Sequence, residues 1–488
     1  MPITEPPLDV LPGPAALIGG ERLHSTGGGS YQHVYAATGR PTVEVRLSGA
    51  DEIDAAVRAA RRALPRWRAM PANERRAALF RLAQLVTGHA ETLSALQTLE
   101  TSVPQRFAAS FPVAAADFFG YYAGWTDKLA GDLIETWPSR ALDYTLPEPY
   151  GVVAVIVPWN GAMVSLAQIA GAAIAAGNTV VLKPPERAPF TALRIGELCL
   201  EAGLPPGVVN VVPAGPEGGD ALVRHPMVDK IHFTGSGATA KKVLAAALDN
   251  LTPVGLELGG KSAHLVFADA NLGMAARQAL AGLVINSGQG CANGTRVLVE
   301  AAVYEEVLRL ASGRLRHIPM GDPFAAGTSM GPVVDEAACL RILSTIDAAG
   351  RAGHGRLVSG GGRLDGELAG GYFVEPTVFA DVDNESPLAQ CEIFGPVLSF
   401  LPFETEREAI ELANASPYGL AGYVHTGDVR RAHRVSQALH AGNVWVNGFA
   451  GIPPSMPFGG TKQSGHGRVG GAAGIREFTR PKNVWTAL

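Results

Sequence analysis

The run GVVAVIVP, residues 151–158, is the stretch that decides the fold. Its apolar residues follow one another without polar alternation, which is typical of a parallel strand that helices cover on both faces. Further runs of this kind are TVVLKPP at 179–185, VVNVVPA at 208–214 and KIHFTG at 230–235. Helical patterns separate the runs, near residues 162–176, 190–202, 217–225 and 238–249. The alternation predicts an α/β fold with a doubly wound parallel sheet.

A second alternation begins after Gly259 and Gly260, which are suited to a hinge between domains. SAHLVF at 262–267 and TRVLVE at 295–300 have strand character, and the stretch 397–447 again alternates between strand and helix patterns. Helices are expected near residues 271–285, 304–316 and 335–349. We therefore predict a second doubly wound α/β domain in the carboxyl-terminal half.

Length and composition agree with a multidomain enzyme. The chain has 488 residues, which at about 150 residues per domain is too long for a single unit. Its 59 glycines are about 12% of the chain, above the usual level of about 7%, but no Gly-X-Y period accompanies them. The net charge is −5 and no dense Lys/Arg block occurs, so we expect neither a nucleic-acid partner nor an anionic membrane surface.

Cysteine and histidine usage points to a reducing compartment without a metal site. The four cysteines form no CxxC pair, and the twelve histidines show no metal-ligand spacing. The amino terminus lacks a cationic segment followed by an apolar one, and Pro158, Asn160 and Gln168 interrupt the longest uncharged stretch. We expect a cytoplasmic protein with no membrane span and no metal.

One glycine-rich turn suggests a dinucleotide. GSGATA at 235–240 follows a predicted strand and opens a predicted helix, so backbone amides and the helix terminus can meet a pyrophosphate. The signal is weak in a chain this rich in glycine. Glu257 lies 22 residues after Gly235, where such a motif places a ribose-binding acid, although a surface carboxylate or a catalytic one is equally open at this point.

A set of five short strings is more specific. They are PWN at 158–160, LELGGKS at 256–262, NSGQGCANGTR at 286–296, EIFGPV at 392–397 and PFGGTKQSG at 457–465. With these motifs in this order, nearly the whole chain resembles the aldehyde dehydrogenase superfamily, in its NAD(P)-dependent, hydrolytic branch that does not acylate CoA.

The resemblance implies a catalytic trio. Cys291 matches the family's nucleophile. A cysteine suits this role because its thiolate can attack a carbonyl carbon. Asn160 matches the amide donor that stabilises the resulting oxyanion together with the Cys291 N–H. Glu257 matches the general base that activates water against a thioester. The alternatives are that Cys291 is a buried apolar residue, that Asn160 is a turn residue, and that Glu257 is a ribose-binding acid or a surface carboxylate. The other cysteines, Cys199, Cys339 and Cys391, are expected to be structural.

The resemblance also implies a cofactor site. Lys183 and Glu186 resemble the pair that contacts the adenosine ribose, so NAD is favoured over NADP, because a carboxylate repels a 2′-phosphate. Ser236, on the Gly235 turn, is expected to meet the pyrophosphate. The residues at the nicotinamide end are Glu392 and Phe394, and the remaining cofactor contacts are Pro158, Trp159 and Leu258.

Several positions depart from the family pattern. Ala240 replaces a third glycine of the phosphate turn, Val469 replaces a frequent Glu, and Val333 stands where Gln is common. Gly161 stands where relatives often have an aromatic residue, and Gln168 follows it on the same helix. Because Gly290 and Ala292 flank the nucleophile, we expect room for a wide or branched aldehyde, such as an aromatic or terpenoid one.

The resemblance further implies a domain plan and a reaction. Residues 1–130 and 151–257 are expected to bind NAD, 258–470 to form the catalytic domain, and 131–150 with 471–488 to form an oligomerisation arm of a homodimer or homotetramer. The expected reaction oxidises a small-molecule aldehyde to a carboxylic acid. The alternatives are a CoA-acylating semialdehyde dehydrogenase, which Glu257 disfavours, and a non-catalytic structural or binding member of the family.

Overall fold

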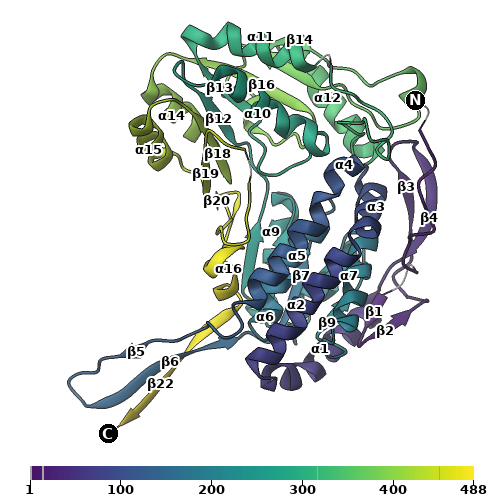
Figure 1. The fold of residues 1–488 in the computed structure, drawn as a ribbon, viewed down its shortest axis with the longest axis vertical. Helices are drawn as coiled ribbons and strands as arrows, with labels where there is room; N and C mark the ends of the chain where they lie inside the picture. The colour runs from purple at the N-terminus through teal and green to yellow at the C-terminus, as the bar shows by residue number, and fades with distance from the viewer. Residues whose placement is uncertain (1–2, 14–15, 316, 450, 488) are drawn as a thin grey trace.

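The computed structural model describes residues 3–13, 16–315, 317–449 and 451–487. Two α/β bodies lie one above the other, and a narrow β arm projects from the lower one, with the carboxyl terminus near its tip (Figure 1). Each body is built around its own sheet, which confirms the predicted α/β class with two doubly wound parallel-sheet domains.

The first sheet has the strand order β2-β1-β9-β8-β7-β10-β11-β21. Its five central strands are parallel, and the outer ones pair antiparallel. From β7 the chain moves through β8 and β9 to one side and then returns to β10 on the other side, so β7 and β10 flank a topological switch point. The strands are β1 (Ala16–Ile18), β2 (Glu21–Leu23), β7 (Val152–Ile156), β8 (Thr179–Lys183), β9 (Val209–Val211), β10 (Lys230–Thr234), β11 (Val254–Glu257) and β21 (Gly465–His466).

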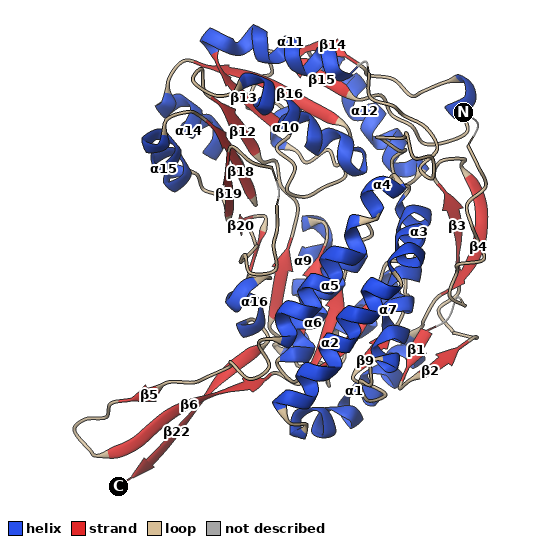
Figure 2. Cartoon of the chain, in the orientation of Figure 1, coloured by secondary structure: helices blue, strands red, loops and turns tan. Residues whose placement is uncertain are grey.

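Helices cover both faces of this sheet (Figure 2). One face carries the apolar cluster that α2 (Ala72–Gly88), α5 (Ser110–Ala123), α6 (Ala162–Ala175) and α7 (Phe190–Glu201) form with the strands. The opposite face packs on α8 (Pro216–Val223), α9 (Gly237–Ala247) and most of α1 (Ala50–Ala69). The shorter α3 (Ala90–Thr101) and α4 (Gln105–Ala108) lead from α2 to α5. The fully buried β7 and β8 explain why their sequences read as uninterrupted apolar runs.

The second sheet has the order β14-β15-β16-β13-β12-β18-β19 and is parallel except for β14. One face packs on α10 (Leu272–Val284) and α11 (Tyr304–Leu315), the other on α12 (Glu336–Ala352), α14 (Glu406–Asn414) and α15 (Val429–Ala438). The strands are β12 (Ala263–Val266), β13 (Arg296–Glu300), β14 (Arg356–Ser359), β15 (Thr377–Ala380), β16 (Val397–Phe403), β18 (Ala421–His425) and β19 (Asn443–Val446). The remaining elements are the hairpin β3 (Ser30–Tyr35) and β4 (Arg40–Arg46), the pair β17 (Tyr418–Gly419) and β20 (Thr461–Lys462), and α13 (Pro387–Gln390).

The arm is a three-stranded sheet of β5 (Leu133–Ile134), β6 (Ala141–Pro149) and β22 (Thr479–Ala487). The nine residues of β22 pair antiparallel with the nine of β6. β22 occupies only the later part of the expected arm span 471–488, because residues 471–476 form the helix α16 (Gly471–Arg476), which packs against α6. Likewise β21, inside the predicted catalytic span 258–470, pairs with β11 of the first sheet.

Candidate active site

Cofactor-side residues gather at one edge of the first sheet. Asn160 and the preceding Pro158 and Trp159 follow β7, Lys183 ends β8, and Gly235 and Ser236 follow β10. The carboxyl ends of neighbouring parallel strands meet at the same edge, and β7 and β10 border the switch point, where ligands of such sheets bind.

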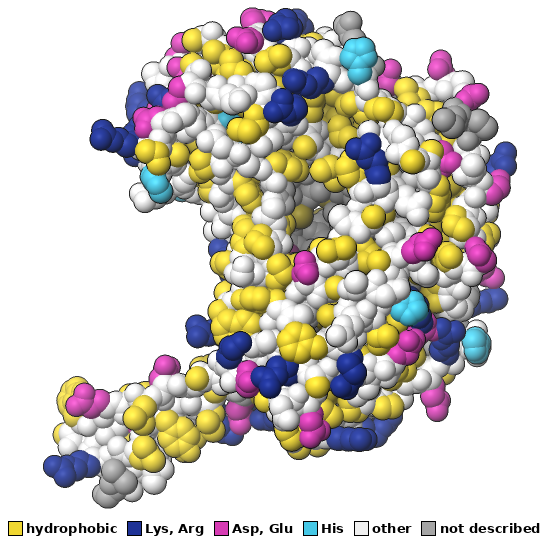
Figure 3. Space-filling view, in the orientation of Figure 1, with side chains coloured by type: hydrophobic (Ala, Val, Ile, Leu, Met, Phe, Trp, Pro, Cys, Tyr) yellow, Lys and Arg dark blue, Asp and Glu magenta, His cyan; other side chains and the backbone are white. Residues whose placement is uncertain are grey.

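The nucleophile comes from the other sheet. Cys291 precedes β13, and Glu392 and Phe394 precede β16, so they lie at the amino ends of strands rather than at carboxyl ends. A Cβ on Gly260 would lie 2.7 Å from the backbone oxygen of Cys291, which means that the segment joining the two domains touches the nucleophile loop directly. The candidate site therefore lies between the facing edges of the two sheets, where Figure 3 shows the molecule hollowed.

Backbone contact also joins the nucleophile loop to the EIFGPV segment. Gly288 has φ +75°, and a Cβ there would lie 2.2 Å from the backbone oxygen of Gly395. A side chain at position 288 would be excluded both by the backbone conformation and by this contact. Glycine is thus required where two motifs pack against each other.

The thiol of Cys291 is partly buried. Burial, together with the nearby carboxyl groups of Glu392 and Glu257, raises its pKa to about 12, while the backbone N–H groups of Cys291 and Ala292 oppose this change. Cys199 and Cys339 are buried, as expected of structural cysteines, but Cys391 is exposed, which does not fit a packing role.

Asn160 is held against the nucleophile loop. Its Nδ2 donates to the backbone oxygen of Gln289 at 3.1 Å, two residues before the thiol. Asn286 Nδ2 donates to the backbone oxygens of both Asn160, at 3.3 Å, and Gln289, at 3.2 Å. Only one N–H of the Asn160 amide is used in these bonds, so the other is left for an oxygen that arrives with a ligand.

Glu257 ends β11 and is 5% exposed. Neither carboxyl oxygen has a hydrogen-bond partner among the described residues. Burial raises the pKa of this group well above its ordinary value, an effect that Arg468 opposes and Glu477 adds to. This burial excludes a surface carboxylate, and the carboxyl group is near enough to Cys291 to raise the pKa of its thiol.

The adenosine-side candidates occupy neighbouring strand ends. Lys183 is buried, and burial lowers the pKa of its amine, while Glu186 opposes the change. Ser236 is the exposed N-cap of α9, its hydroxyl accepting from the Thr239 N–H at 3.2 Å.

The nicotinamide-side candidates also contact one another. The rings of Trp159 and Phe394 meet edge to face, with centroids 5.7 Å apart at 86°. Glu392 Oε1 accepts from the Gly260 N–H at 3.1 Å, and burial raises the pKa of this carboxyl to about 7, against the effect of Lys261 and Arg341. Leu258 follows Glu257, and its N–H donates to Ser464 at 3.0 Å.

These residues fit a dinucleotide. The buried hydroxyl of Thr234, at the end of β10, has no hydrogen-bond partner within the described ranges, and the next turn opens the amino terminus of α9 toward the same edge. Backbone donors at a helix terminus suit a pyrophosphate, and carboxylates such as Glu186 and Glu392 suit ribose hydroxyls.

Sequence reasoning missed the residues that fix the catalytic loops. Gln289 is fully buried and accepts from the Val334 N–H at 2.9 Å, which anchors the nucleophile loop. Tyr423 donates its hydroxyl to the Ala292 backbone oxygen at 2.9 Å, and Ser464 donates to the Gly259 backbone oxygen at 2.7 Å. Ser464 lies in the PFGGTKQSG string, which was already singled out, whereas Tyr423, inside a buried strand, carries no local signal.

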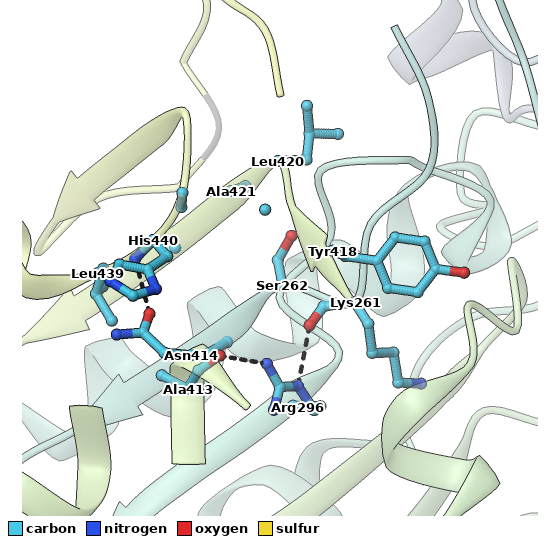
Figure 4. A pocket seen from close by; sticks show the side chains of 14 residues that line it. Lys261, Ser262, Arg296, Ala413, Asn414, Tyr418, Leu420, Ala421, Leu439 and His440 are labelled. Carbon is cyan, nitrogen blue, oxygen red and sulfur yellow. Dashed lines mark hydrogen bonds between the residues drawn. The ribbon is translucent and has the colours of Figure 1, made fainter. Parts of the chain in front are cut away.

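A small pocket at the amino ends of β12, β13 and β18 is lined by Lys261, Ser262 and Arg296, among others (Figure 4). The Arg296 guanidinium donates to backbone oxygens of Lys261, Leu412 and Ala413 and to the side chain of Asn384. Its hydrogen bonds tie β13 to neighbouring segments, so we assign it a structural role rather than one in the candidate site.

The described ranges contain no cluster of three or more His, Cys, Asp or Glu side chains placed to hold a metal ion. Within the same part of the chain, no helix is both long enough and apolar enough to cross a membrane.

Comparison with known proteins identifies the family. The family model described as "Aldehyde dehydrogenase family" matches residues 23–484. Aldehyde dehydrogenase family 2 member B4 of Arabidopsis thaliana is 42% identical over 97% of this chain and 88% of its own length, and human retinal dehydrogenase 2 is 41% identical over 96% and 90%.

Solved structures agree with the sequence comparisons. Betaine aldehyde dehydrogenase from Staphylococcus aureus, in complex with NAD+, superposes with a TM-score of 0.95 at 35% identity, covering 98% of this chain and 96% of that one. An aldehyde dehydrogenase mutant from Bacillus cereus gives a TM-score of 0.96 at 38% identity and covers 100% of both chains. The chain belongs to the aldehyde dehydrogenase family.

Proposed function

We propose that this NAD-dependent aldehyde dehydrogenase oxidises its substrate to a carboxylic acid with Cys291 as the nucleophile, Asn160 as the oxyanion donor and Glu257 as the general base. The observation that supports these roles most is the buried carboxyl group of Glu257, which has no hydrogen-bond partner in the described ranges and raises the pKa of the Cys291 thiol. An unpaired buried carboxyl is costly, and such groups concentrate at sites of proton transfer.

Attack on the aldehyde is the first step. The Cys291 sulfur, as thiolate, bonds to the carbonyl carbon, and the carbonyl electron pair moves onto oxygen to give a thiohemiacetal alkoxide. The second N–H of the Asn160 amide and the Cys291 N–H can donate to this oxygen. A donor of this kind contributes about 3 to 4 kcal/mol to the stability of the transition state.

Collapse of the alkoxide releases hydride and leaves a thioester on Cys291. NAD, when held by the residues below, would supply the acceptor for that hydride. Trp159, Phe394 and Glu392 are the residues that we assign to orienting the nicotinamide end, and Lys183, Glu186 and Ser236 those that we assign to the adenosine and pyrophosphate end.

Hydrolysis completes the cycle. Glu257 takes a proton from water while the water oxygen bonds to the thioester carbon, and the sulfur leaves as the Cys291 thiolate. The acid product departs, and Glu257 returns its proton to solvent. Because the pKa of Glu257 is raised by burial, this carboxyl is better matched to proton transfer near neutral pH than an exposed one.

The arm supports self-association. Leu133 on β5 and Trp137 in the loop between β5 and β6 are 79% and 87% exposed, and Trp485 on β22 is 53% exposed, so the arm presents several large apolar side chains to solvent. We assign this surface to pairing between copies of the chain, as a homodimer or homotetramer. A cytoplasmic location stays a prediction from cysteine usage.

An aldehyde panel with NAD or NADP, in the presence and absence of CoA, tests the proposed function. Wild type should form NADH and free acid without CoA, whereas Cys291→Ala should form none and Cys199→Ala should retain activity. Dependence on CoA would favour the acylating alternative. Absence of NADH with every aldehyde would favour a non-catalytic role.

A further inference from the structure

One face of α6 is accessible and leads away from the oxyanion donor. In α6 and the residue before it, the partly exposed positions are Gly161, Val164, Ser165 and Gln168. All other residues of the helix are buried. The spacing of three and four residues puts these positions on a single stripe. The stripe begins beside Asn160, which is bonded to the nucleophile loop.

The stripe belongs to a wall of aromatic and apolar side chains. Cys291, Val164 and the partly buried Phe449 and Met456 all pack against the apolar cluster on the α6 face of the first sheet. Tyr423, which donates to the Ala292 backbone, stacks on Trp445 and Phe449 with ring centroids 5.2 and 5.5 Å apart. Leu258 belongs to the cluster on the α9 face, so the dinucleotide and the aldehyde reach the thiol from different faces of the sheet.

Charged side chains are missing from the segments that form this wall. Residues 159–175, 286–294 and 445–458 include no Asp, Glu, Lys, Arg or His. In Figure 3 the walls of the hollow are mostly hydrophobic or other uncharged side chains, with one acidic side chain near the lower edge. A substrate with a negative charge in its body would lose hydration there without gaining a charged partner, and a cationic one would gain only contacts with aromatic rings.

Two polar side chains on the stripe have no hydrogen-bond partner in the described ranges. They are Ser165, about 6 Å along the helix axis from Gly161, and Gln168, about 10 Å from it. Side chains on a helix lean toward its amino terminus, which for α6 is the end where Asn160 lies. The Gln168 amide also lies beside the turn at Gly470, where a Cβ would be 3.6 Å from its Nε2.

Resting on the proposed function, we infer that the preferred substrate is an uncharged aromatic aldehyde with a hydrogen-bonding oxygen at the end remote from the carbonyl, and that Gln168 binds this oxygen. The aromatic body lies along Val164 and Phe449, and the carbonyl carbon meets Cys291. Ser165, one turn closer to the thiol, faces the middle of the substrate.

Paired substrates test this assignment. For wild type, kcat/KM should be about tenfold higher for 4-hydroxycinnamaldehyde than for cinnamaldehyde, as expected of one hydrogen bond, and higher for both than for betaine aldehyde or succinic semialdehyde. Gln168→Leu should bring the two cinnamaldehydes to equal kcat/KM, mainly through KM, while the rate with cinnamaldehyde itself is maintained.

Gln32→Leu, on the distant β3 strand, is the matched control and should keep the wild-type preference. If Gln168→Leu fails to fold, the shorter Gln168→Asn should reduce the preference in its place. An unchanged preference in the Gln168 variants, or a wild type that prefers a charged aldehyde, would overturn the inference and leave the proposed function standing. A wild type that oxidises no aldehyde with NAD would refute the proposed function itself.

Discussion

Cys291 lies where burial and two carboxyl groups oppose its ionisation, which raises the pKa of the thiol to about 12. The backbone N–H groups of Cys291 and Ala292 oppose this effect, and the Asn160 amide lies beside the same loop. Hydrogen-bond donors that the loop has already positioned are therefore needed to stabilise a negative charge on the sulfur, or on the oxygen of a substrate bonded to it.

Replacement of Asn160 by Ala should lower kcat/KM by about 10² to 10³, because the oxyanion loses a preorganised donor. Steady-state kinetics with one aldehyde would measure the change. Asn271→Ala, which removes only the N-cap of α10, should leave kcat/KM close to wild type. A loss of less than threefold in Asn160→Ala would show that this amide is not the donor.

The pH profile of thioester hydrolysis should report Glu257. Since burial raises the pKa of this carboxyl, the base becomes ionised only as pH rises, and hydrolysis should accelerate with pH through that raised pKa. Rapid-quench measurement of acid release would define the profile. An acyl-enzyme that hydrolyses at one rate across the acidic and neutral range would contradict the role of the base.

At the scale of the elements, one buried carboxyl group organises the start of α7. Glu100, 4% exposed at the end of α3, accepts from the backbone N–H groups of Phe190 and Thr191 and from the Thr191 hydroxyl. These are donors that the first turn of a helix cannot satisfy by itself. Glu100 thereby joins the α3–α4 segment to the helix layer of the first sheet.

Glu100→Ala should destabilise the fold by about 1 to 3 kcal/mol, because buried donors lose their acceptor. Burial raises the pKa of Glu100 from 4.5 to about 7, so the folded state retains a proton that the unfolded chain releases between these values. The stability of wild type should therefore fall relative to Glu100→Gln as pH rises from 4.5 to about 7. Denaturant titrations at several pH values would show it, and a difference that does not vary with pH would contradict it.

The sequence predicts the central elements well. An uninterrupted apolar run such as 151–158 can bury all of its side chains in a parallel sheet that helices cover on both faces. Two-residue strands escape this reasoning. β21 joins the first sheet through its pairing with β11, and β17 pairs with β20, both by contacts distant in sequence. The same limit applies to Tyr423 and Gln289, whose partners are set by the tertiary fold rather than by a motif.

At the scale of the molecule, two facing sheet edges divide the chemistry. The first sheet supplies the switch-point edge with Asn160 and the cofactor candidates, and the second supplies Cys291 and Glu392. Glu257 ends the last parallel strand of the first sheet, immediately before the segment that crosses between the domains. A change in the relative position of the domains would therefore alter the distance between the proposed base and the proposed nucleophile.

Substitutions in the arm should change the assembly of the protein. Leu133→Ser combined with Trp137→Ser should reduce the particle mass in sedimentation velocity, because it removes apolar surface that we assign to contact between copies. Leu357→Ser, which alters an exposed residue of β14 far from the arm, should not change the mass. A monomeric wild type would refute the assignment.

The most direct test of the catalytic assignment is rapid-mixing kinetics of Glu257→Gln with NAD and an aldehyde that the wild type oxidises. The carboxamide keeps the size of the side chain but cannot accept the proton from water. We predict a burst of NADH approaching one equivalent per active site, an acyl-Cys291 adduct detectable by mass spectrometry, and almost no further turnover. A steady-state rate equal to that of wild type, with no accumulated adduct, would contradict the account.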